Sequence, residues 1–191
     1  MPAGVETARD LVGPAIAAAV DRLSPEVRTV AAYHLGLDGS GAGKALRPAL
    51  ALLSARAAGA SPERGVPAAV AVELVHNFSL LHDDIMDGDT ERRHRPTAWT
   101  VHGVGAAILA GDALLALAQD ILLEDTAAQG TWAARCLSAA VLRLIAGQGA
   151  DLAFEQRNDV NLPECLTETD MPDEVRAEFA GIAEFITARQ W

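Results

Sequence analysis

The feature that most constrains the fold of this chain is a cluster of three aspartates in an apolar helical segment. Asp83, Asp84 and Asp87 directly follow Phe78-Ser79-Leu80-Leu81-His82. Asp83 and Asp87 are four residues apart and therefore share one face of a helix, with Asp84 one step around it. Carboxylates on an apolar helix are costly unless they are paired or hold a metal ion. In the folded chain this end of the helix must therefore either be exposed to solvent or bind a cation.

Two arginines, Arg92 and Arg93, follow the cluster and change its interpretation. Neighbouring carboxylates raise one another's pKa, and a hard divalent cation relieves that cost. Mg²⁺ in proteins takes one or two carboxylates and completes its shell with water and phosphate oxygens. The pattern favours a pocket that holds a divalent cation and a phosphate. The alternative is a solvated acidic helix end, continued by Asp89 and Glu91.

Helical periodicity accounts for most of the chain. Apolar residues at three- and four-residue spacing predict helices over residues 7–23, 25–36, 45–59, 66–88, 98–125, 131–158 and 173–189. Aromatic residues make up only 4% of the sequence, and alanine and leucine dominate, which favours helix over sheet. We find no alternating strand pattern and no linker that would divide domains. The sequence predicts an all-α helical bundle, with residues 1–191 as a single domain.

The net charge and the cysteine content indicate which kinds of partner and which cellular compartment to expect. The formal net charge is -11, which argues against a nucleic-acid surface. Cys136 and Cys165 have neither disulfide-framework nor metal-ligand spacing, so we expect a cytoplasmic protein. The longest apolar stretch, residues 106–118, is interrupted by Asp112, and the N-terminus lacks a signal-peptide pattern. We therefore expect no transmembrane segment.

A glycine-rich turn before a predicted helix start is a second candidate site. Gly41-Ala42-Gly43 leads into Lys44, the only lysine of the chain, and Arg47 follows three residues later. Free backbone N–H groups and two cations at a helix start favour an anion. The spacing is not that of a P-loop, and by itself the segment is better explained as a flexible loop with two surface cations.

A third group of polar residues lies near the end of the longest predicted helix. Gln148, Asp151 and Glu155 share one face of a mostly apolar segment. Polar groups on such a face need partners. Either they form a buried network inside the bundle or they contribute to a ligand site.

These three segments, in this order, resemble the trans-type polyprenyl diphosphate synthases, an all-helical family that makes geranylgeranyl and related diphosphates. The resemblance covers residues 43–166 and implies an isoprenoid-synthase-like helical bundle. It is carried by Gly43-Lys44-Ala45-Leu46-Arg47-Pro48, Glu73-Leu74-Val75-His76, Leu81-His82-Asp83-Asp84-Ile85-Met86-Asp87, Arg92-Arg93, Pro96-Thr97, Trp99, Gly111-Asp112, and Gly147-Gln148 through Glu164-Cys165-Leu166.

The resemblance also implies a cofactor, two substrates and a set of site residues. Mg²⁺ would be held by Asp83, Asp84, Asp87 and Asp151; the allylic diphosphate would be contacted by Arg92 and Gln148; and isopentenyl diphosphate would be bound by Lys44, Arg47, His76 and Arg93. The implied catalytic residues are Asp83, Asp84, Asp87 and Arg92. Phe78 and Ser79, one turn before the first aspartate, would set the length of the product, and geranylgeranyl diphosphate is the expected one.

The chain departs from the family pattern in its last part. The sequence has no second Asp-Asp-x-x-Asp motif, since Asp170-Met171-Pro172-Asp173 has the wrong spacing and contains a proline. Residues 173–191 resemble the family's last helix. The sequence therefore predicts a truncated member that lacks most of the C-terminal half, and a homodimer or a heterodimer with a full-length synthase.

Three alternatives to a catalytic synthase stay open. The first is a non-catalytic regulatory partner of a full-length synthase. The second is a class I terpene cyclase, although Asn158-Asp159-Val160-Asn161-Leu162 lacks the hydroxyl residue that its second metal motif needs at the fifth position. The third is an acidic helical module without a ligand.

Overall fold

The computed structural model describes residues 3–37, 39, 45–124 and 128–155. The predicted all-α fold is confirmed: the helices are α1 (Ala3–Val20), α2 (Pro25–Leu35), α3 (Leu46–Ala57), the 3-10 helix η1 (Pro62–Gly65), α4 (Val66–Met86), α5 (Ala98–His102), α6 (Val104–Leu123) and α7 (Ala128–Glu155). The chain forms two compact units, Met1–Val141 and Leu142–Trp191, which we describe separately. The interpretation of residues 1–191 as a single domain stays a prediction.

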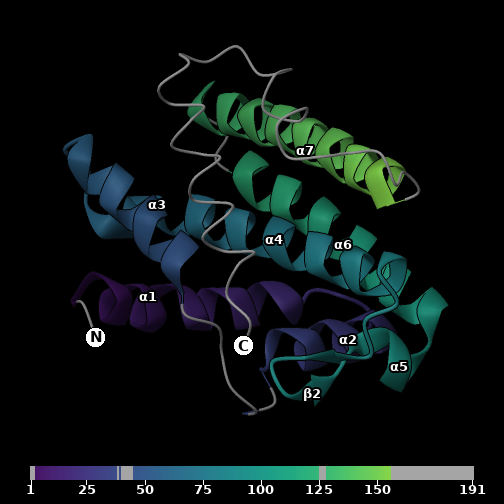
Figure 1. Cartoon of the computed structure of the whole chain (residues 1–191). Helices are drawn as coiled ribbons and strands as arrows, with labels where there is room; N and C mark the ends of the chain where they lie inside the picture. The colour runs from purple at the N-terminus through teal and green to yellow at the C-terminus, as the bar shows by residue number, and fades with distance from the viewer. Residues whose placement is uncertain (1–2, 38, 40–44, 125–127, 156–191) are drawn as a thin grey trace. The chain divides into compact units, whose positions relative to one another are not determined.

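Helices α4 and α6 form the centre of the first unit and run side by side (Figure 1). Leu74 and Leu81 of α4 and Leu114 of α6 are fully buried. Burial of each such side chain contributes about 1.5–3 kcal/mol. Many of the other core positions are alanines, such as Ala69 and Ala107, and small side chains let the helices approach closely. This packing fixes the end of α4, where the aspartates lie.

A glycine in α6 makes the closest of these approaches possible. A Cβ atom added to Gly111 would lie 2.4 Å from Nε2 of His82 on α4. The His82 ring also lies 3.2 Å, through Nε2, from the carbonyl oxygen of Ile108, and it meets the Phe78 ring edge-on at a centroid distance of 4.8 Å. His82 therefore occupies the space that a side chain at position 111 would need.

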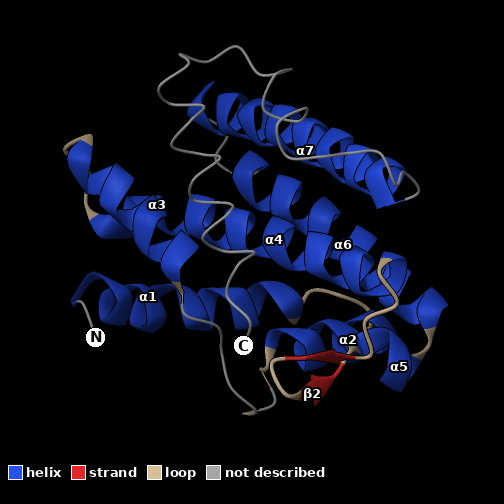
Figure 2. Cartoon of the chain, in the orientation of Figure 1, coloured by secondary structure: helices blue, strands red, loops and turns tan. Residues whose placement is uncertain are grey.

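Helix α2 and a small hairpin lie together in the same unit (Figure 2). Pro25 follows Ser24 at the start of α2, and Gly36, with φ of 70°, ends the helix by donating its N–H to the carbonyl oxygen of Tyr33 at 3.2 Å. The hairpin pairs β1 (Glu91–Arg92) antiparallel to β2 (Arg95–Pro96). We expected no strand; two residues per strand are too few to produce an alternating pattern.

Two expected boundaries differ from the observed ones. The segment predicted as one helix over 98–125 is two helices, α5 and α6, because Gly103 adopts φ of 89° and ψ of 155°, a conformation that glycine reaches without strain. Helix α1 begins before residue 7 and includes Pro14. The helix predicted over 173–189 lies outside the described residues.

Helix α7 continues from the first unit into the second. Ala134 and Val141, in its part that belongs to the first unit, are buried, and Gln119 Nε2 donates to Ser138 Oγ at 3.0 Å. In the second unit, Leu142, Leu144 and Ile145 are exposed.

In the part of the chain that the structure describes, two helices, Val104–Leu123 and Ala128–Phe154, are long and apolar enough to cross a membrane by length and composition alone. Core helices of soluble proteins meet the same criterion, and α6 carries much of the core of its unit. The absence of a transmembrane segment stays a prediction.

Candidate active site

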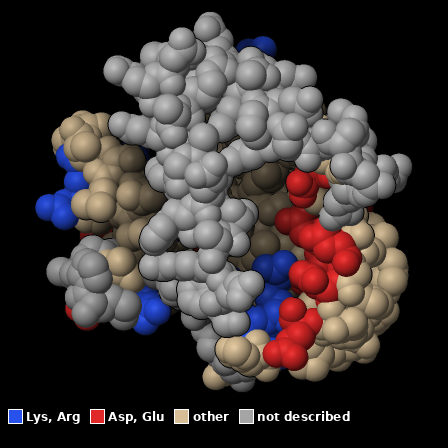
Figure 3. Space-filling model, viewed as in Figure 1, with Lys and Arg blue, Asp and Glu red and all other residues tan. Residues whose placement is uncertain are grey.

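The three aspartates of the cluster lie at the end of α4 but in different surroundings. Asp83 is half-buried, Asp84 is buried and Asp87, which caps the helix, is exposed. Burial raises the pKa of Asp83, and the neighbouring Asp87 raises it further. Asp83 and Asp87 therefore act on one another electrostatically, as their four-residue spacing predicts. Figure 3 shows acidic side chains gathered beside basic ones on one part of the face in view.

Unlike Asp83 and Asp87, Asp84 is buried, and it is paired with Arg92. Nε of Arg92 donates to Oδ1 of Asp84 at 2.6 Å, and the Asp84 side chain is only 1% exposed. Its second oxygen, Oδ2, is buried and has no hydrogen-bond partner among the described residues. Burial raises the pKa of Asp84, although the hydrogen bond from Arg92 opposes that shift. Oδ2 is thus a buried acceptor that is free for a cation or a donor.

Hydrogen bonds join the two ends of the hairpin that carries the arginines. The N–H of Thr97 donates to the carbonyl oxygen of Thr90 at 3.0 Å, and its hydroxyl donates to that of Asp89 at 2.8 Å. The indole N–H of Trp99 donates to the same Asp89 oxygen at 2.7 Å. These bonds fix the segment between the aspartates and the arginines.

Several cations converge on two histidines beside the hairpin. Burial, followed by Arg47, Arg93 and Arg92, lowers the pKa of His76 to about 4. Burial, followed by Arg92, Arg93, His76 and Arg95, lowers the pKa of His34 to about 4. Both imidazoles are therefore neutral at pH 7. Three elements, α2, α4 and the hairpin, together with the start of α3, bring this positive charge into one place.

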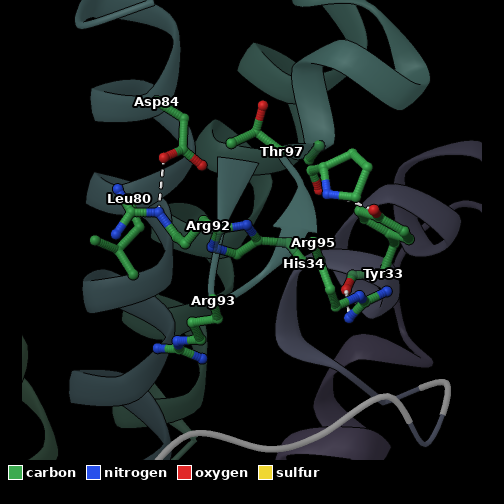
Figure 4. Close-up of a pocket in the computed structure, with 10 residues that line it drawn as sticks. Tyr33, His34, Leu80, Asp84, Arg92, Arg93, Arg95 and Thr97 are labelled. Carbon is green, nitrogen blue, oxygen red and sulfur yellow. Dashed lines mark hydrogen bonds and ion pairs between the residues drawn. The ribbon is translucent and has the colours of Figure 1, made fainter. Parts of the chain in front are cut away.

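A pocket of about 60 Å³ opens between α2, α4, the hairpin and the start of α5 (Figure 4). It is lined by Tyr33, His34, Leu80, Asp84, Arg92, Arg93, Arg95, Pro96, Thr97 and Ala98. Figure 4 shows Arg92 directed toward Asp84 and Arg95 lying beside Tyr33. Arginine guanidinium groups bind phosphate oxygens in a bidentate manner. A pocket with this lining is suited to an anionic group that carries several oxygens.

The residues at the end of α4 fit Mg²⁺. Within residues 3–37, 45–124 and 128–155, no three His, Cys, Asp or Glu side chains are grouped so that they would hold a metal ion by themselves. Mg²⁺ does not require such a group, because it binds through one or two carboxylates and fills its shell with water and substrate phosphate oxygens. The adjacent Asp83 and Asp87 carboxylates, and the unpartnered Oδ2 of Asp84, are oxygen ligands of this kind.

Comparison with known proteins identifies the family. A profile of the Polyprenyl synthetase family matches residues 28–171. The chain belongs to this family. It is 50% identical over 166 residues to a (2E,6E)-farnesyl diphosphate synthase of Mycobacterium tuberculosis, a match that covers 83% of this chain and 46% of that protein. It is 44% identical over 171 residues to a geranylgeranyl diphosphate synthase of the same organism, over 85% of this chain and 49% of that protein.

A solved structure gives the same family and fold. The polyprenyl synthetase from Streptomyces coelicolor A3(2) superposes with a TM-score of 0.81 and 55% identity, over 86% of this chain and 51% of that one. The chain thus spans about half the length of the relatives that it matches. The predicted isoprenoid-synthase-like bundle is confirmed for the part of the chain that is described.

The structure brings together several of the site residues that were expected from the sequence. Arg47 and Arg93 of the expected isopentenyl diphosphate site both lie within electrostatic reach of His76, while Lys44 lies outside the described residues. Gln148 is half-buried and Asp151 is exposed; both belong to the second unit, so their expected roles stay predictions. Phe78 is buried, and Ser79 donates its hydroxyl to the carbonyl oxygen of His76 at 2.8 Å.

Three polar side chains of the pocket belong to none of the motifs that the sequence indicated. They are Tyr33 and His34 of α2 and Arg95 of β2. Arg95 belongs to the basic run Arg92-Arg93-His94-Arg95, and that run could have indicated it. Tyr33 and His34 belong to no motif in the sequence, and they line the pocket because α2 packs beside the hairpin.

Proposed function

We propose that this chain works as a Mg²⁺-dependent prenyltransferase that condenses isopentenyl diphosphate with an allylic diphosphate. The observation that carries the proposal is the convergence of Arg47, Arg92 and Arg93 on His76, next to the aspartates at the end of α4. The names of the two mycobacterial relatives, farnesyl and geranylgeranyl diphosphate synthase, support the same chemistry. Because the chain spans about half their length, the activity of the whole enzyme is part of the proposal.

The aspartates would hold the cofactor and the arginines the leaving group. Asp83, Asp84 and Asp87 would hold Mg²⁺, with Asp151 as a further ligand. Bound Mg²⁺ neutralises the charge that develops on a departing diphosphate. Arg92 would bind the allylic diphosphate with Gln148 through its Nη groups, because only its Nε is paired with Asp84. The pair gives Arg92 Nε and Asp84 Oδ1 one partner each, and Asp84 Oδ2 has no partner among the described residues.

The second substrate would bind on the other side of the arginines. Lys44, Arg47, His76 and Arg93 would hold the diphosphate of isopentenyl diphosphate, and neutral His76 would donate its N–H to a phosphate oxygen. The allylic C–O bond breaks with its electron pair leaving on diphosphate, the isopentenyl double bond attacks the allylic carbon, and a proton passes to the released diphosphate. Phe78 and Ser79 would limit the growing tail, with geranylgeranyl diphosphate as the expected product.

A product assay tests the proposal. The full chain is incubated with Mg²⁺, isopentenyl diphosphate and an allylic diphosphate of five, ten or fifteen carbons. We expect a product one isoprene unit longer, lost in Asp83→Asn and Asp87→Asn but kept in Asp10→Asn, which changes an exposed aspartate of α1. Absence of product from the folded parent would contradict catalysis by this chain.

A second candidate function is that of a non-catalytic partner subunit. The observation in its favour is an exposed apolar strip on α6, made of Val104, Ile108 and Leu109, which are 45%, 39% and 60% exposed. Such a strip is typical of a protein–protein contact. Capture of a full-length synthase by the parent but not by Leu109→Glu, together with a negative product assay, would favour this role.

A further inference from the structure

The hairpin that carries the site's arginines has little structure of its own. Each strand has two residues, and the turn residues Arg93 and His94 adopt φ of 55° and 61°. A two-stranded hairpin of this size is marginal in water, and non-glycine residues at positive φ are strained. The orientation of Arg92 and Arg93 therefore depends on ties to other elements.

Tyr33 at the end of α2 supplies three such ties to β2. Its hydroxyl donates to the carbonyl oxygen of Pro96 at 2.8 Å. The guanidinium carbon of Arg95 lies 4.4 Å from the centre of the Tyr33 ring, and Nη1 of Arg95 donates to the Tyr33 carbonyl oxygen at 3.4 Å (Figure 4). A cation over an aromatic face and a cation at a helix C-terminus are both favourable. One residue thus holds both residues of β2.

The position of β2 determines the positions of Arg92 and Arg93, which line the pocket. Arg95 pairs with Arg92 across the hairpin, and the turn between them is Arg93-His94. A shift of β2 therefore moves Arg92 and Arg93 together. The Tyr33 ring also packs against the His102 ring of α5, at a centroid distance of 5.2 Å and an interplanar angle of 77°.

We propose that Tyr33 is a positioning residue for the diphosphate site, acting through Pro96 and Arg95 to hold Arg92 and Arg93 in the binding geometry. The inference rests on the proposed function. Without the ties, the hairpin spends part of its time in other arrangements, and the apparent affinity falls by the fraction of competent molecules.

Binding of inorganic pyrophosphate with Mg²⁺, measured by calorimetry on the full chain, is the first arm of the test. Tyr33→Phe removes the hydroxyl but keeps the ring, and Tyr33→Leu removes both. We expect about 3- to 10-fold weaker binding by Tyr33→Phe and a larger loss in Tyr33→Leu. Ser54→Ala is the matched control, because Ser54 also donates a hydroxyl to a carbonyl oxygen at 2.8 Å, within α3. We expect it to bind within about twofold of the parent.

The arginine Nε–H signals in NMR spectra are the second arm, and they need no ligand. The Arg95 signal should be shifted by the Tyr33 ring in the parent and in Tyr33→Phe, and lose that shift in Tyr33→Leu. The Arg92 and Arg93 signals should move in Tyr33→Phe and stay in place in Ser54→Ala. Unchanged Arg92 and Arg93 signals in folded Tyr33→Phe would overturn the inference. A parent that binds no pyrophosphate would instead overturn the proposed function.

Discussion

At the scale of single residues, His94 offers a direct measure of the strain in the hairpin turn. Its φ is 61° and its side chain is fully exposed, so the residue contributes backbone strain without packing. A non-glycine residue in the left-handed region costs about 1–2 kcal/mol, part of which glycine loses again to its larger unfolded-state entropy. We expect His94→Gly to raise the free energy of unfolding by about 0.5–1 kcal/mol in urea titrations. His94→Ala keeps the strain, and equal stability of the two variants would contradict this explanation.

His34 predicts a specific dependence of stability on pH. Its pKa is about 4 in the folded chain, below its value of 6.5 in an unfolded one. As the pH falls below about 6.5, the unfolded state takes up the proton first, so this contribution to stability is lost between about pH 6.5 and pH 4. His76 behaves in the same direction, whereas the raised pKa values of Asp83 and Asp84 act in the opposite one.

A comparison with His34→Gln isolates that effect. Between about pH 7.5 and pH 5, we expect the parent to lose more unfolding free energy than the variant, because glutamine does not titrate. The contributions of His76 and the aspartates are present in both proteins. Parallel losses in urea titrations would show that His34 is not a buried neutral histidine.

Residues with a recognisable spacing could be predicted, and residues whose role depends on tertiary packing could not. Asp83 and Asp87 share a helix face by their spacing alone, and the motifs indicated Arg47, His76 and Arg93. Tyr33 contacts Arg95 across 62 positions of sequence, and no local pattern reveals that contact. Asp84 has the same appearance in sequence as Asp83, yet its burial and its pair with Arg92 set it apart.

At the scale of the elements, helices were predictable and short irregular pieces were not. The apolar period of α4 covers many turns, so its existence and its exposed end follow from the sequence. The hairpin has two residues per strand, and α5 has five residues, which is too short for a period to show. The division of α5 from α6 depends on the φ of one glycine, Gly103, and glycines within helical patterns are common.

The contact between α4 and α6 yields a prediction at Gly111. A methyl group at this position would lie 2.4 Å from His82 Nε2, so one of the two helices must shift or the ring must rotate. We expect Gly111→Ala to lower the free energy of unfolding by about 1–3 kcal/mol. Gly147→Ala in α7 is the matched control, since a Cβ there has no neighbour within 4 Å, and it should be stabilising by up to about 1 kcal/mol.

The same clash can be tested by removing its other partner. In a His82→Ala background the space beside Gly111 is free, and Gly111→Ala should there be neutral or stabilising. Urea titrations of the single and double variants give the coupling free energy. If Gly111→Ala lowers the free energy of unfolding equally in both backgrounds, its effect does not come from a clash with His82.

At the scale of the whole molecule, the exposed strip on α6 predicts self-association. Leu109 is 60% exposed beside Ile108, and burying such a strip between two chains would remove it from water. We expect the parent to associate with increasing concentration in sedimentation experiments and Leu109→Glu to do so less. Leu50→Glu in α3 is the control, since Leu50 is 55% exposed. Equal behaviour of the two variants would exclude the α6 strip as the contact.

The family could be recognised from sequence because its motifs occur in a fixed order along the chain, and this order survives at 50% identity over 166 residues. The way in which those motifs meet in space depends on α2, α4 and the hairpin packing together. Short segments such as the hairpin contribute little to any sequence pattern, yet they carry the arginines.

The bond from the Trp99 indole to the Asp89 carbonyl has a practical consequence for spectroscopy. The chain has three tryptophans, of which Trp132 is 69% exposed on α7. With Trp132 and Trp191 replaced by phenylalanine, the remaining emission would come from Trp99, whose N–H holds the segment between the aspartates and the arginines at 2.7 Å. A ligand that binds the aspartates or the arginines on either side of this segment would change both the polarity around the indole and its hydrogen bond. The emission wavelength of one native side chain would then report occupancy of the site without any attached dye.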